Sequence, residues 1–229
     1  SVDDVATLRE VLPPGSLLVR LDPINQASAQ QVDAAIEAGA DWLMLPFFHG
    51  PDEVAHFCRM VGGRRPVMLL AETPGACDLI AECCAIDGVE RVHIGLNDLS
   101  LLTKRNFMFQ LLTDGTVDRV AAQLRAIGMP FGIGGVARVG EGDLLAEDIV
   151  LQHVRLGSDA AILSRTFHRR AERLEEIEAD MNFAAEVEKL RLAFRHGQNL
   201  AASQLDQEHL RIAARIDEIA AKTSAKPGR

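Results

Sequence analysis

The sequence predicts an α/β fold of the (β/α)₈ barrel type, followed by a helical tail. Short β-rich runs alternate along the chain with amphipathic stretches, which is the pattern of a parallel sheet covered by helices. Most of the strand cores are continuous apolar runs, as expected for strands that are buried on both faces. The length of 229 residues and the apolar content of 48% suit one large α/β domain, or one domain plus an appendage.

Six segments carry the strand signal, a short apolar or β-branched run bounded by turn residues. They are Leu17–Leu21, Trp42–Phe47, Val67–Ala71, Arg91–Gly95, Phe131–Ile133 and Ala160–Ser164. A closed barrel of this type needs eight strands. We therefore expect that two more strands, in about fifty residues by the usual size of βα units, precede Ser1 in the native protein, or that the sheet is open beside Leu17–Leu21.

Four helices are predicted between these strands from their amphipathic patterns, and each of them ends near a glycine that suits a C-cap. They cover Ala29–Ala38, Pro51–Val61, Gly75–Ile86 and Val117–Ile127. We find no internal repeat and no low-complexity tract, so the βα alternation is the main organising pattern of the first part of the chain.

From Ala171 onward the strand signal disappears, and Glu, Arg, Ala and Leu dominate. Two helices, Ala171–Arg195 and Asp206–Ala221, are predicted here, joined near Gly197. We expect the polar end of the chain, Thr223–Arg229, to be frayed.

This change of character predicts a barrel domain over residues 1–170 and a helical tail over residues 171–229. Five side chains of the tail recur at helical spacing and could form one apolar stripe: Leu205, His209, Ile212, Ile216 and Ile219. Because this face has no obvious partner within six βα units, we expect the tail to pack on a neighbouring subunit or across the outer wall of the barrel. Either arrangement favours a homo-oligomer.

Composition excludes several classes of partner and location. The net charge of −9 argues against nucleic acid and anionic membranes as partners. No run of about 18 uncharged apolar residues occurs, so we expect no membrane-spanning helix, and the first residues lack the pattern of a signal peptide. Four cysteines fit neither a zinc pattern nor a disulfide framework, and we interpret them as packing residues of a cytoplasmic protein. They are Cys58, Cys77, Cys83 and Cys84.

Two neighbouring strands end in carboxylates, Glu72 and Asp98. In an α/β barrel the catalytic groups lie at the carboxyl ends of the strands. Two hard oxygen ligands leave positions of an octahedral ion for water and substrate, which is how Mg²⁺ or Mn²⁺ is usually held. The alternative is that Glu72 caps the helix that starts near Pro74, and that Asp98 is a turn residue.

Arg20 leaves a strand that is otherwise apolar, and a cation there costs free energy unless it meets an anion. A substrate carboxylate is a good candidate, because the guanidinium fork binds it with two hydrogen bonds. A structural ion pair with Asp22 or Asp41 explains the same residue equally well.

Other polar groups near strand ends have a structural explanation as well as a functional one. Gly134-Gly135 favours a tight turn, or else a close approach of the backbone to a ligand. Arg138 and Glu141 could pair with each other or line the mouth of the barrel. Among the histidines, His93 lies inside a strand, which favours a packed core residue, whereas His49 lies at a strand exit and could act as an acid or base.

Three stretches together carry a resemblance to a known family. They are Ala40–Pro46 (ADWLMLP), Leu69–Pro74 (LLAETP) and Gly88–Ser100 (GVERVHIGLNDLS). With these motifs the chain resembles the HpcH/HpaI aldolase and citrate lyase superfamily over roughly Leu17–Arg165, and it is most similar to an uncharacterised aldolase/citrate lyase branch.

The resemblance implies an enzyme with a (β/α)₈ barrel, often assembled as trimers or hexamers. It implies that Glu72 and Asp98 hold Mg²⁺ or Mn²⁺, which chelates a pyruvate-like 2-oxo acid, and that Arg20 is catalytic and steadies the developing enolate. Backbone amides at the turn Gly95-Leu96-Asn97 would bind the substrate carboxylate. The implied reaction is retro-aldol cleavage or its reverse, as in class II aldolases. A citramalyl- or malyl-CoA-type lyase, or a non-catalytic barrel that binds metal and oxo acid, is the alternative.

Two features depart from the family pattern. In the class II aldolases of this family a glutamine often stands two residues before the metal-binding glutamate, where this chain has Leu70. Those aldolases also take a His–Asp acid–base pair from an early strand, and nothing before Leu17 supplies one. The identity of the acid–base group therefore stays open.

Overall fold

The computed structural model describes residues 1–224, which divide into two compact units. The first unit comprises residues 1–102 and 123–131, and the second comprises residues 103–122 and those from 132 onward. Within the described residues, no helix combines the length and the apolar character that crossing a membrane requires.

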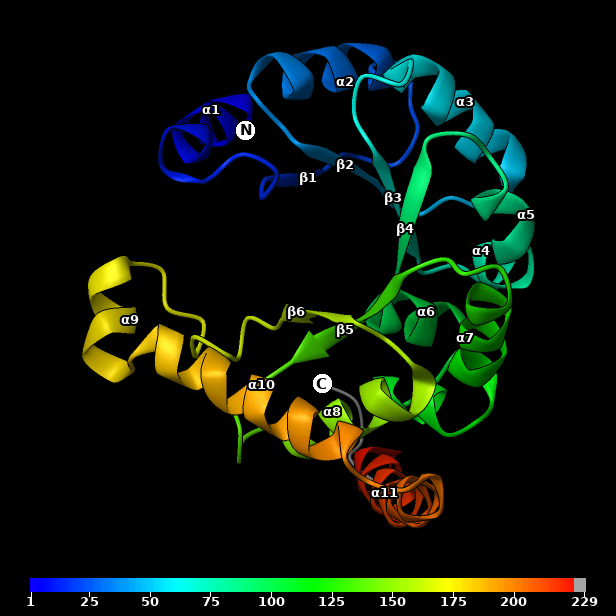
Figure 1. Ribbon diagram of the computed structural model, residues 1–229, viewed down its shortest axis with the longest axis vertical. Coiled ribbons are helices and arrows are strands. Elements are labelled where there is room, and N and C mark those ends of the chain that lie inside the picture. Colours follow the sequence, from blue (N-terminus) through cyan, green and yellow to red (C-terminus); the bar gives the residue numbers. More distant parts are fainter. Residues whose placement is uncertain (225–229) are drawn as a thin grey trace. The chain divides into compact units, whose positions relative to one another are not determined.

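Four parallel strands build the first unit, and they pair in the order in which they occur in the chain (Figure 1). They are β1 (Leu18–Arg20), β2 (Trp42–Leu45), β3 (Val67–Ala71) and β4 (Val89–Ile94). Val67–Ala71 coincides with the predicted strand, and the other three differ from their predictions by one or two residues at the ends. Strand β1 pairs only with β2 in this unit, so its other edge is unpaired there, as expected beside Leu17–Leu21.

The register of these strands shows which of their side chains lie on the same face of the sheet. Arg20 pairs with Met44, Met44 pairs with Met68, and further along the strands Leu70 pairs with His93. Because successive side chains of a strand point to opposite faces, these residues share one face. The alternate residues form the other face and are fully buried: Leu43, Leu45, Leu69, Ala71, Val92 and Ile94.

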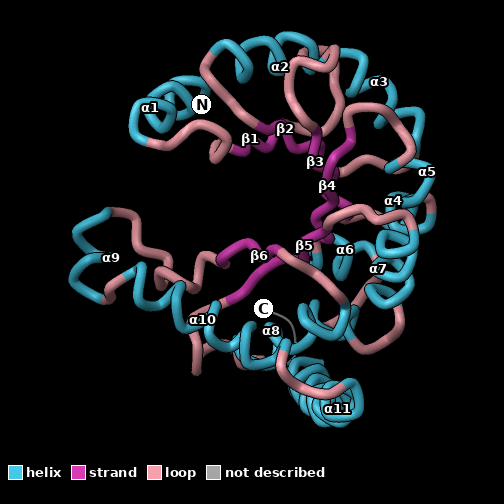
Figure 2. The backbone as a smooth tube through the Cα atoms, viewed as in Figure 1, coloured by secondary structure: helices cyan, strands magenta, loops and turns pink. Residues whose placement is uncertain are grey.

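Helices cover the outer side of this sheet (Figures 1 and 2). Their bounds are α1 (Val2–Val11), α2 (Ser28–Glu37), α3 (Pro51–Val61), α4 (Pro74–Asp78), α5 (Ile80–Cys84) and α6 (Leu96–Leu102). Helix α3 matches the prediction, since Pro51 begins it and Gly62, with φ 62°, ends it. The single helix predicted for Gly75–Ile86 is wrong, because the chain leaves helical geometry at Leu79 and forms two short helices instead.

Helix α1 was not predicted. Only one of its residues, Val5, is buried, so the segment lacks the apolar stripe by which a helix is found in a sequence. It is attached to the unit through Arg9, whose guanidinium lies 2.6 Å from the carboxylate of Asp41.

The second unit contains two further parallel strands, β5 (Phe131–Val136) and β6 (Ala160–Leu163), the first of which begins in the first unit. Its helices are η1 (Met108–Leu112), α7 (Thr116–Ala126), which also crosses the boundary, α8 (Ala146–Leu156), α9 (Leu174–Asp180), α10 (Phe183–Gln198) and α11 (Ala202–Ser224). With six parallel strands alternating with helices, the predicted fold class is confirmed. The two additional strands stay a prediction.

Strand β5 corrects one interpretation of the sequence. The pair Gly134-Gly135 does not make a tight turn that ends the strand at Ile133. Instead, β5 continues to Val136 through a register irregularity between Ile133 and Val136, and Gly135 adopts φ 50° there. A glycine in a strand often marks such an irregularity.

The tail forms three helices instead of two, since α9 is separate from α10. Helices α10 and α11 both pack on α8, which connects β5 and β6 in the same chain. The predicted stripe of α11 faces inward: Ile212 and Ile216 are fully buried. The first two residues of the polar end, Thr223 and Ser224, belong to α11, and residues 225–229 lie outside the described part of the chain, so its fraying stays a prediction.

The cysteines behave as predicted. All four are free thiols, and Cys77, Cys83 and Cys84 are buried among the helices that follow β3. Burial raises the pKa of the Cys83 thiol to about 11 and that of Cys84 to about 12, so these groups stay protonated and unreactive at neutral pH.

Candidate functional site

The structure brings the two predicted carboxylates together. Glu72 follows the last residue of β3, and Asp98 lies in the first turn of α6, directly after β4. Because β3 and β4 are neighbouring parallel strands, their carboxyl ends lie side by side. The carboxyl group of Asp98 lies close enough to that of Glu72 to raise its pKa.

Glu72 is only 5% exposed, and its protonation reflects this burial. Burial, and after it the charge and hydrogen bond of Asp98, raise the pKa of Glu72 to about 7. The backbone amide of Phe47 and the charge of Arg20 oppose this rise. Glu72 is therefore partly protonated near neutral pH, which is a usual consequence of burying a carboxyl group beside another acid.

Glu72 is not a helix cap, so the structural alternative for this residue is wrong. Thr73 caps α4 instead, since its hydroxyl oxygen accepts a hydrogen bond of 3.1 Å from the amide of Ala76. The same hydroxyl donates a bond of 2.6 Å to the carbonyl of Phe48. Thr73 thus fixes the exit of β3 to the exit of β2, and Glu72 is left free to face Asp98.

Gly95, at the end of β4, makes room for the carboxylate pair. A Cβ atom at this position would stand 2.8 Å from the Cβ of Glu72 and 3.0 Å from its carboxylate oxygen. Such contacts are shorter than van der Waals distances, so any side chain at position 95 would displace Glu72. The glycine of the sequence motif is therefore explained by the closeness of the two strand exits.

Phe47 holds the other side of Glu72. Its backbone amide donates a hydrogen bond of 3.1 Å to the Glu72 carboxylate. Its φ angle is 53°, in the left-handed region, which costs a bulky L-residue on the order of 1–2 kcal/mol. Strain of this kind persists only where surrounding structure imposes it, and it is concentrated at functional sites. The sequence contained no signal for it, because positive φ is expected at glycine or asparagine and not at phenylalanine.

Arg20 is the last residue of β1, and it lies close enough to Glu72 for its charge to act on the carboxyl group. Both of its suggested structural partners are engaged elsewhere: Asp41 with Arg9, and Asp22 with the amide nitrogen of Gln31 at 2.7 Å. The structure therefore shows neither ion pair that could have explained Arg20. Its charge acts on Glu72, whose pKa it lowers.

The turn after β4 is placed beside the pair, but its groups differ in availability. The amide of Gly95 donates to the carbonyl of Ala71 at 3.0 Å and is used by the sheet. The side-chain amide of Asn97 donates to the Asp98 carboxylate at 3.3 Å. Of the three predicted substrate-binding residues, Gly95 thus contributes space, Asn97 supports Asp98, and Leu96 begins α6.

The remaining candidates are resolved by their surroundings. His93 is buried as predicted, and desolvation together with Arg91 lowers its pKa to about 4, so it is neutral at neutral pH. His49 is exposed, and its ring packs edge to face on Phe47 with 5.9 Å between ring centroids. In the second unit, Arg138 does pair with Glu141, at 3.5 Å, and additionally with Asp180, at 2.8 Å.

The donor set fits a hard divalent cation bound by few protein ligands. Two carboxylates stand together, and no group of three or more metal-binding side chains is found among residues 1–224. Ions such as Mg²⁺ keep several water ligands and accept one or two carboxylates. A cation would also replace the proton that Glu72 holds near neutral pH in its absence.

Comparison by sequence finds no matching family profile and no matching curated protein. Comparison of structures finds clear relatives of the fold. An HpcH/HpaI aldolase/citrate lyase family protein from Burkholderia cenocepacia J2315 superposes with a TM-score of 0.61 and 20% identity, covering 79% of this chain and 81% of that one. A citrate lyase from Burkholderia xenovorans LB400 covers all of this chain, with 81% of its own length, a TM-score of 0.60 and 14% identity.

A third similar structure is the protein CitE from Mycobacterium tuberculosis in complex with magnesium and pyruvate. It has a TM-score of 0.60 and 16% identity, and the match covers 92% of this chain and 80% of that one. These likenesses show that the chain has the fold found in HpcH/HpaI aldolase and citrate lyase structures. The resemblance predicted from the sequence motifs is thereby confirmed at the level of the fold.

Proposed function

We propose that this protein is a divalent-metal-dependent carbon–carbon lyase of the class II aldolase type, which cleaves or forms a 2-oxo acid through a pyruvate-like enolate. The observation that carries the proposal is the placement of Glu72 and Asp98 directly after two neighbouring strands, where the charges of Asp98 and Arg20 both act on Glu72. The fold adds support, since one protein that shares it was crystallised with magnesium and pyruvate.

Glu72 and Asp98 are the proposed ligands of Mg²⁺ or Mn²⁺. When bound, such an ion supplies Lewis-acid stabilisation of the negative charge that develops on the 2-oxo group. The protein's part is to hold the two carboxylates in place, which it does through the Phe47 amide on one side and the absence of a side chain at Gly95 on the other. Holding the ligands in this way lowers the reorganisation needed during the reaction.

Arg20 is proposed to bind the substrate carboxylate and to add a second positive charge beside the enolate oxygen. Its guanidinium group has five N–H donors in a planar fork, which matches a carboxylate. The backbone amides of Leu96 and Asn97 are proposed to complete the carboxylate site, while Gly95 keeps the space open. The proton-transfer group is left unassigned.

The decisive experiment offers the protein 4-hydroxy-2-oxo acids with Mg²⁺ or Mn²⁺ and measures release of pyruvate. Wild type should release pyruvate, and Glu72→Gln should not. Glu90→Gln is a matched control, because Glu90 is an exposed glutamate of the neighbouring strand β4. Cleavage of a citramalyl- or malyl-CoA ester instead would identify a CoA-ester lyase. Metal-dependent binding of oxalate without any turnover would identify a non-catalytic barrel.

The tail is proposed to support a homo-oligomer, such as a trimer or hexamer. Several large apolar side chains of the tail stay exposed although α10 and α11 pack on α8: Leu174, Phe183, Leu192 and Leu210. These side chains are available for contact with another subunit. A cytoplasmic location is part of the proposal, because four free cysteines suit a reducing compartment. Light scattering of the protein in solution tests the oligomer.

A further inference from the structure

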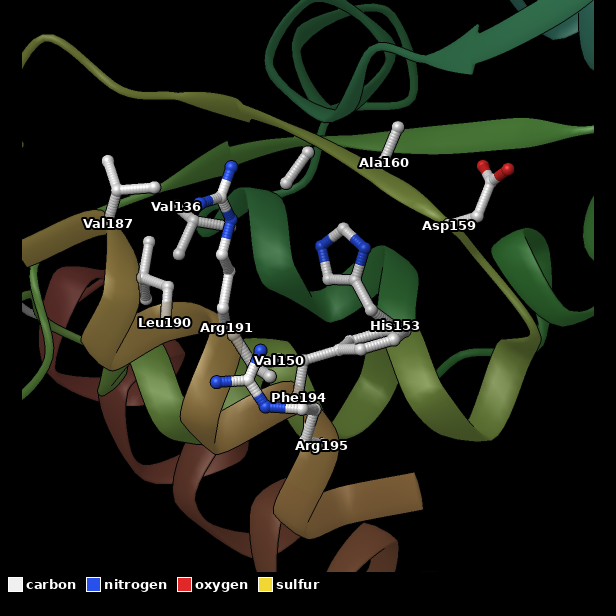
Figure 3. A pocket seen from close by; sticks show the side chains of 11 residues that line it. Val136, Val150, His153, Asp159, Ala160, Val187, Leu190, Arg191, Phe194 and Arg195 are labelled. Atoms are coloured by element: carbon white, nitrogen blue, oxygen red, sulfur yellow. The ribbon is translucent and has the colours of Figure 1, made fainter. Parts of the chain in front are cut away.

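The second unit contains a cavity of about 340 Å³ that the proposed lyase site does not use (Figure 3). Its walls come from the β5–β6 pair, from α8 and from α10. Most of the lining side chains are apolar, and four of them belong to α8 or α10: Val150, Val187, Leu190 and Phe194. This size and this lining are typical of pockets that hold small organic molecules.

One face of α10 covers the cavity. Val187, Leu190, Arg191, Phe194 and Arg195 recur at spacings of three and four residues, so they lie on the same side of the helix. The sequence predicts a solvated surface for this charged stretch, and the side chains of Arg191 and Arg195 are indeed 67% and 53% exposed. The apolar residues of the same face line the cavity beside them.

The cavity has a fixed polar wall as well as an apolar one. His153 of α8 is 4% exposed and contributes to the lining. Its Nδ1 atom lies 2.9 Å from the hydroxyl of Ser158, and that hydroxyl donates to the carbonyl of Ala160. Since the hydroxyl proton is used there, Nδ1–H is the donor to Ser158, and the ring is held in one orientation. The position of His153 in the wall of the cavity is therefore fixed before any ligand binds.

Arg191 supplies a positive charge beside this apolar space. In Figure 3 its side chain extends from α10 toward the strand that carries Val136. Its closest carboxylate, Glu188, is 3.7 Å away, beyond hydrogen-bond distance, and the same Glu188 is in closer contact with Arg195. One carboxylate thus serves two guanidinium groups, which leaves donors of the solvent-exposed Arg191 available to a further anion. The carboxylate of Asp159 also lines the cavity.

Close packing between α8 and α10 restricts changes in the shape of the cavity. At the far end of α10, Gly197 packs directly on α8: a Cβ atom there would stand 3.0 Å from the Val154 side chain and 3.2 Å from that of Leu151. The helices are in contact at this point and across much of their length. A preformed cavity loses little conformational entropy when a ligand enters it.

We propose that this cavity is a second binding site, for a small carboxylate that carries an apolar body such as an aryl or branched alkyl chain. The apolar body lies among Val150, Val187, Leu190 and Phe194, and the carboxylate is bound by Arg191 with support from Arg195. The site does not use Glu72, Asp98 or Arg20, so an experiment can disprove this proposal without disproving the proposed lyase reaction.

The experiment titrates the full chain with 4-phenylbutyrate in a buffer containing EDTA, and follows binding by NMR. EDTA keeps the metal-dependent site from contributing. We expect wild type to bind the acid at least about tenfold more tightly than the uncharged 4-phenylbutyramide, because a guanidinium–carboxylate pair is lost in the amide. Arg191→Met should lower affinity for the acid to that of the amide, whereas Arg215→Met, an exposed arginine of α11, should leave it unchanged.

A second variant tests the cavity itself. Ala161→Phe places a ring in the cavity from the exposed side of β6 and should abolish binding of both compounds while the thermal unfolding temperature stays near that of wild type. Arg20→Lys should bind 4-phenylbutyrate like wild type. The proposal is overturned if wild type binds neither compound at millimolar concentration, if Arg191→Met binds the acid as wild type does, or if Arg20→Lys loses the binding.

Discussion

The exits of β3 and β4 in the first unit and the exit of β5 in the second both carry charged side chains that are withdrawn from solvent. Glu72 and Arg138 are each 5% exposed. The surroundings differ. Arg138 meets two carboxylates, Asp180 and Glu141, and Arg169 meets the same two at 2.6 and 2.9 Å. Glu72 instead meets another acid, Asp98.

This difference separates a structural cluster from a candidate functional one. At the β5 exit two cations balance two anions, and the cluster connects α9 to the strand exit of its own unit. At the β3–β4 exits, burial and then the charge of Asp98 raise the pKa of Glu72 to about 7, and nearby Arg20 has neither of its expected partners. A charge that no other group of the protein balances can be balanced by a bound ligand.

The largest expected effect follows from removing one acid of the pair. Glu72→Ala or Asp98→Ala should weaken Mn²⁺ binding by more than about 100-fold, since loss of an outer partner of a metal ligand alone costs ~10–100-fold. Both variants should still fold, because residues at the mouth of a barrel contribute little to its hydrophobic core. Calorimetry with Mn²⁺ measures the affinity, and Glu90→Ala is the control. Unchanged affinity in either variant would remove the basis of the metal assignment.

The opposite behaviour is expected at the β5 exit. Arg138→Ala should lower the free energy of unfolding by about 2–3 kcal/mol, because it leaves the carboxylates of Asp180 and Glu141 without their buried cation. Mn²⁺ affinity should stay unchanged. Denaturant unfolding measures the loss, and Arg173→Ala is the control, since Arg173 is 71% exposed and pairs only within its own helix end. If Arg138→Ala is as stable as wild type but binds Mn²⁺ with a different affinity, the cluster at the β5 exit is functional and not structural.

Arg20 tests whether the unbalanced cation serves a ligand. Arg20→Lys should weaken binding of oxalate to the Mn²⁺-loaded protein by about tenfold, because lysine keeps the charge but loses the planar fork. Metal affinity and thermal stability should be retained. If the variant instead loses stability while oxalate affinity stays the same, Arg20 is a structural residue.

The raised pKa of Glu72 predicts a pH dependence of stability with a definite sign. The pKa of Glu72 is about 7 in the folded protein, above its ordinary value of 4.5. The folded state therefore holds this proton more tightly than the unfolded chain, and the metal-free protein should lose stability as pH rises from about 4.5 to 7. Comparing unfolding of wild type and Glu72→Gln across this range isolates the effect. Equal slopes for the two proteins would contradict it.

The sequence predicted those parts of the structure that local rules determine. Pro51 and Gly62 mark the ends of α3, and the apolar run Val67–Ala71 could be buried only as a strand. The pairing of Glu72 with Asp98 was also predictable, because parallel strands bring their carboxyl ends to one edge. Helix α8 could have been found as well, since its buried residues recur at helical spacing before Gly157.

Other features depend on contacts that no local pattern reveals. The break at Leu79 divides a stretch whose apolar residues suit one continuous helix. The cavity beneath α10 arises from the packing of this helix on β5, α8 and β6, which no local pattern in the sequence reveals. The positive φ of Phe47 is imposed by the Glu72 carboxylate and by the chain on either side, and phenylalanine itself disfavours it.

Phe47 provides the smallest predicted effect and the most direct test of how the carboxylate pair is held. Phe47→Gly and Phe47→Ala both remove the ring and its contact with His49, and they differ mainly in how well they tolerate a φ of 53°. Glycine adopts this angle without strain, whereas a left-handed conformation costs alanine free energy.

At most positions of a fold the glycine variant is less stable than the alanine variant, because glycine increases the entropy of the unfolded chain. At position 47 the order should be inverted, with Phe47→Gly more stable than Phe47→Ala by about 1 kcal/mol in denaturant unfolding. Mn²⁺ affinity should follow the same order, since the glycine variant keeps the amide directed at Glu72. If the alanine variant is the more stable, the Phe47 backbone is not strained, and the amide is not what positions the carboxylate.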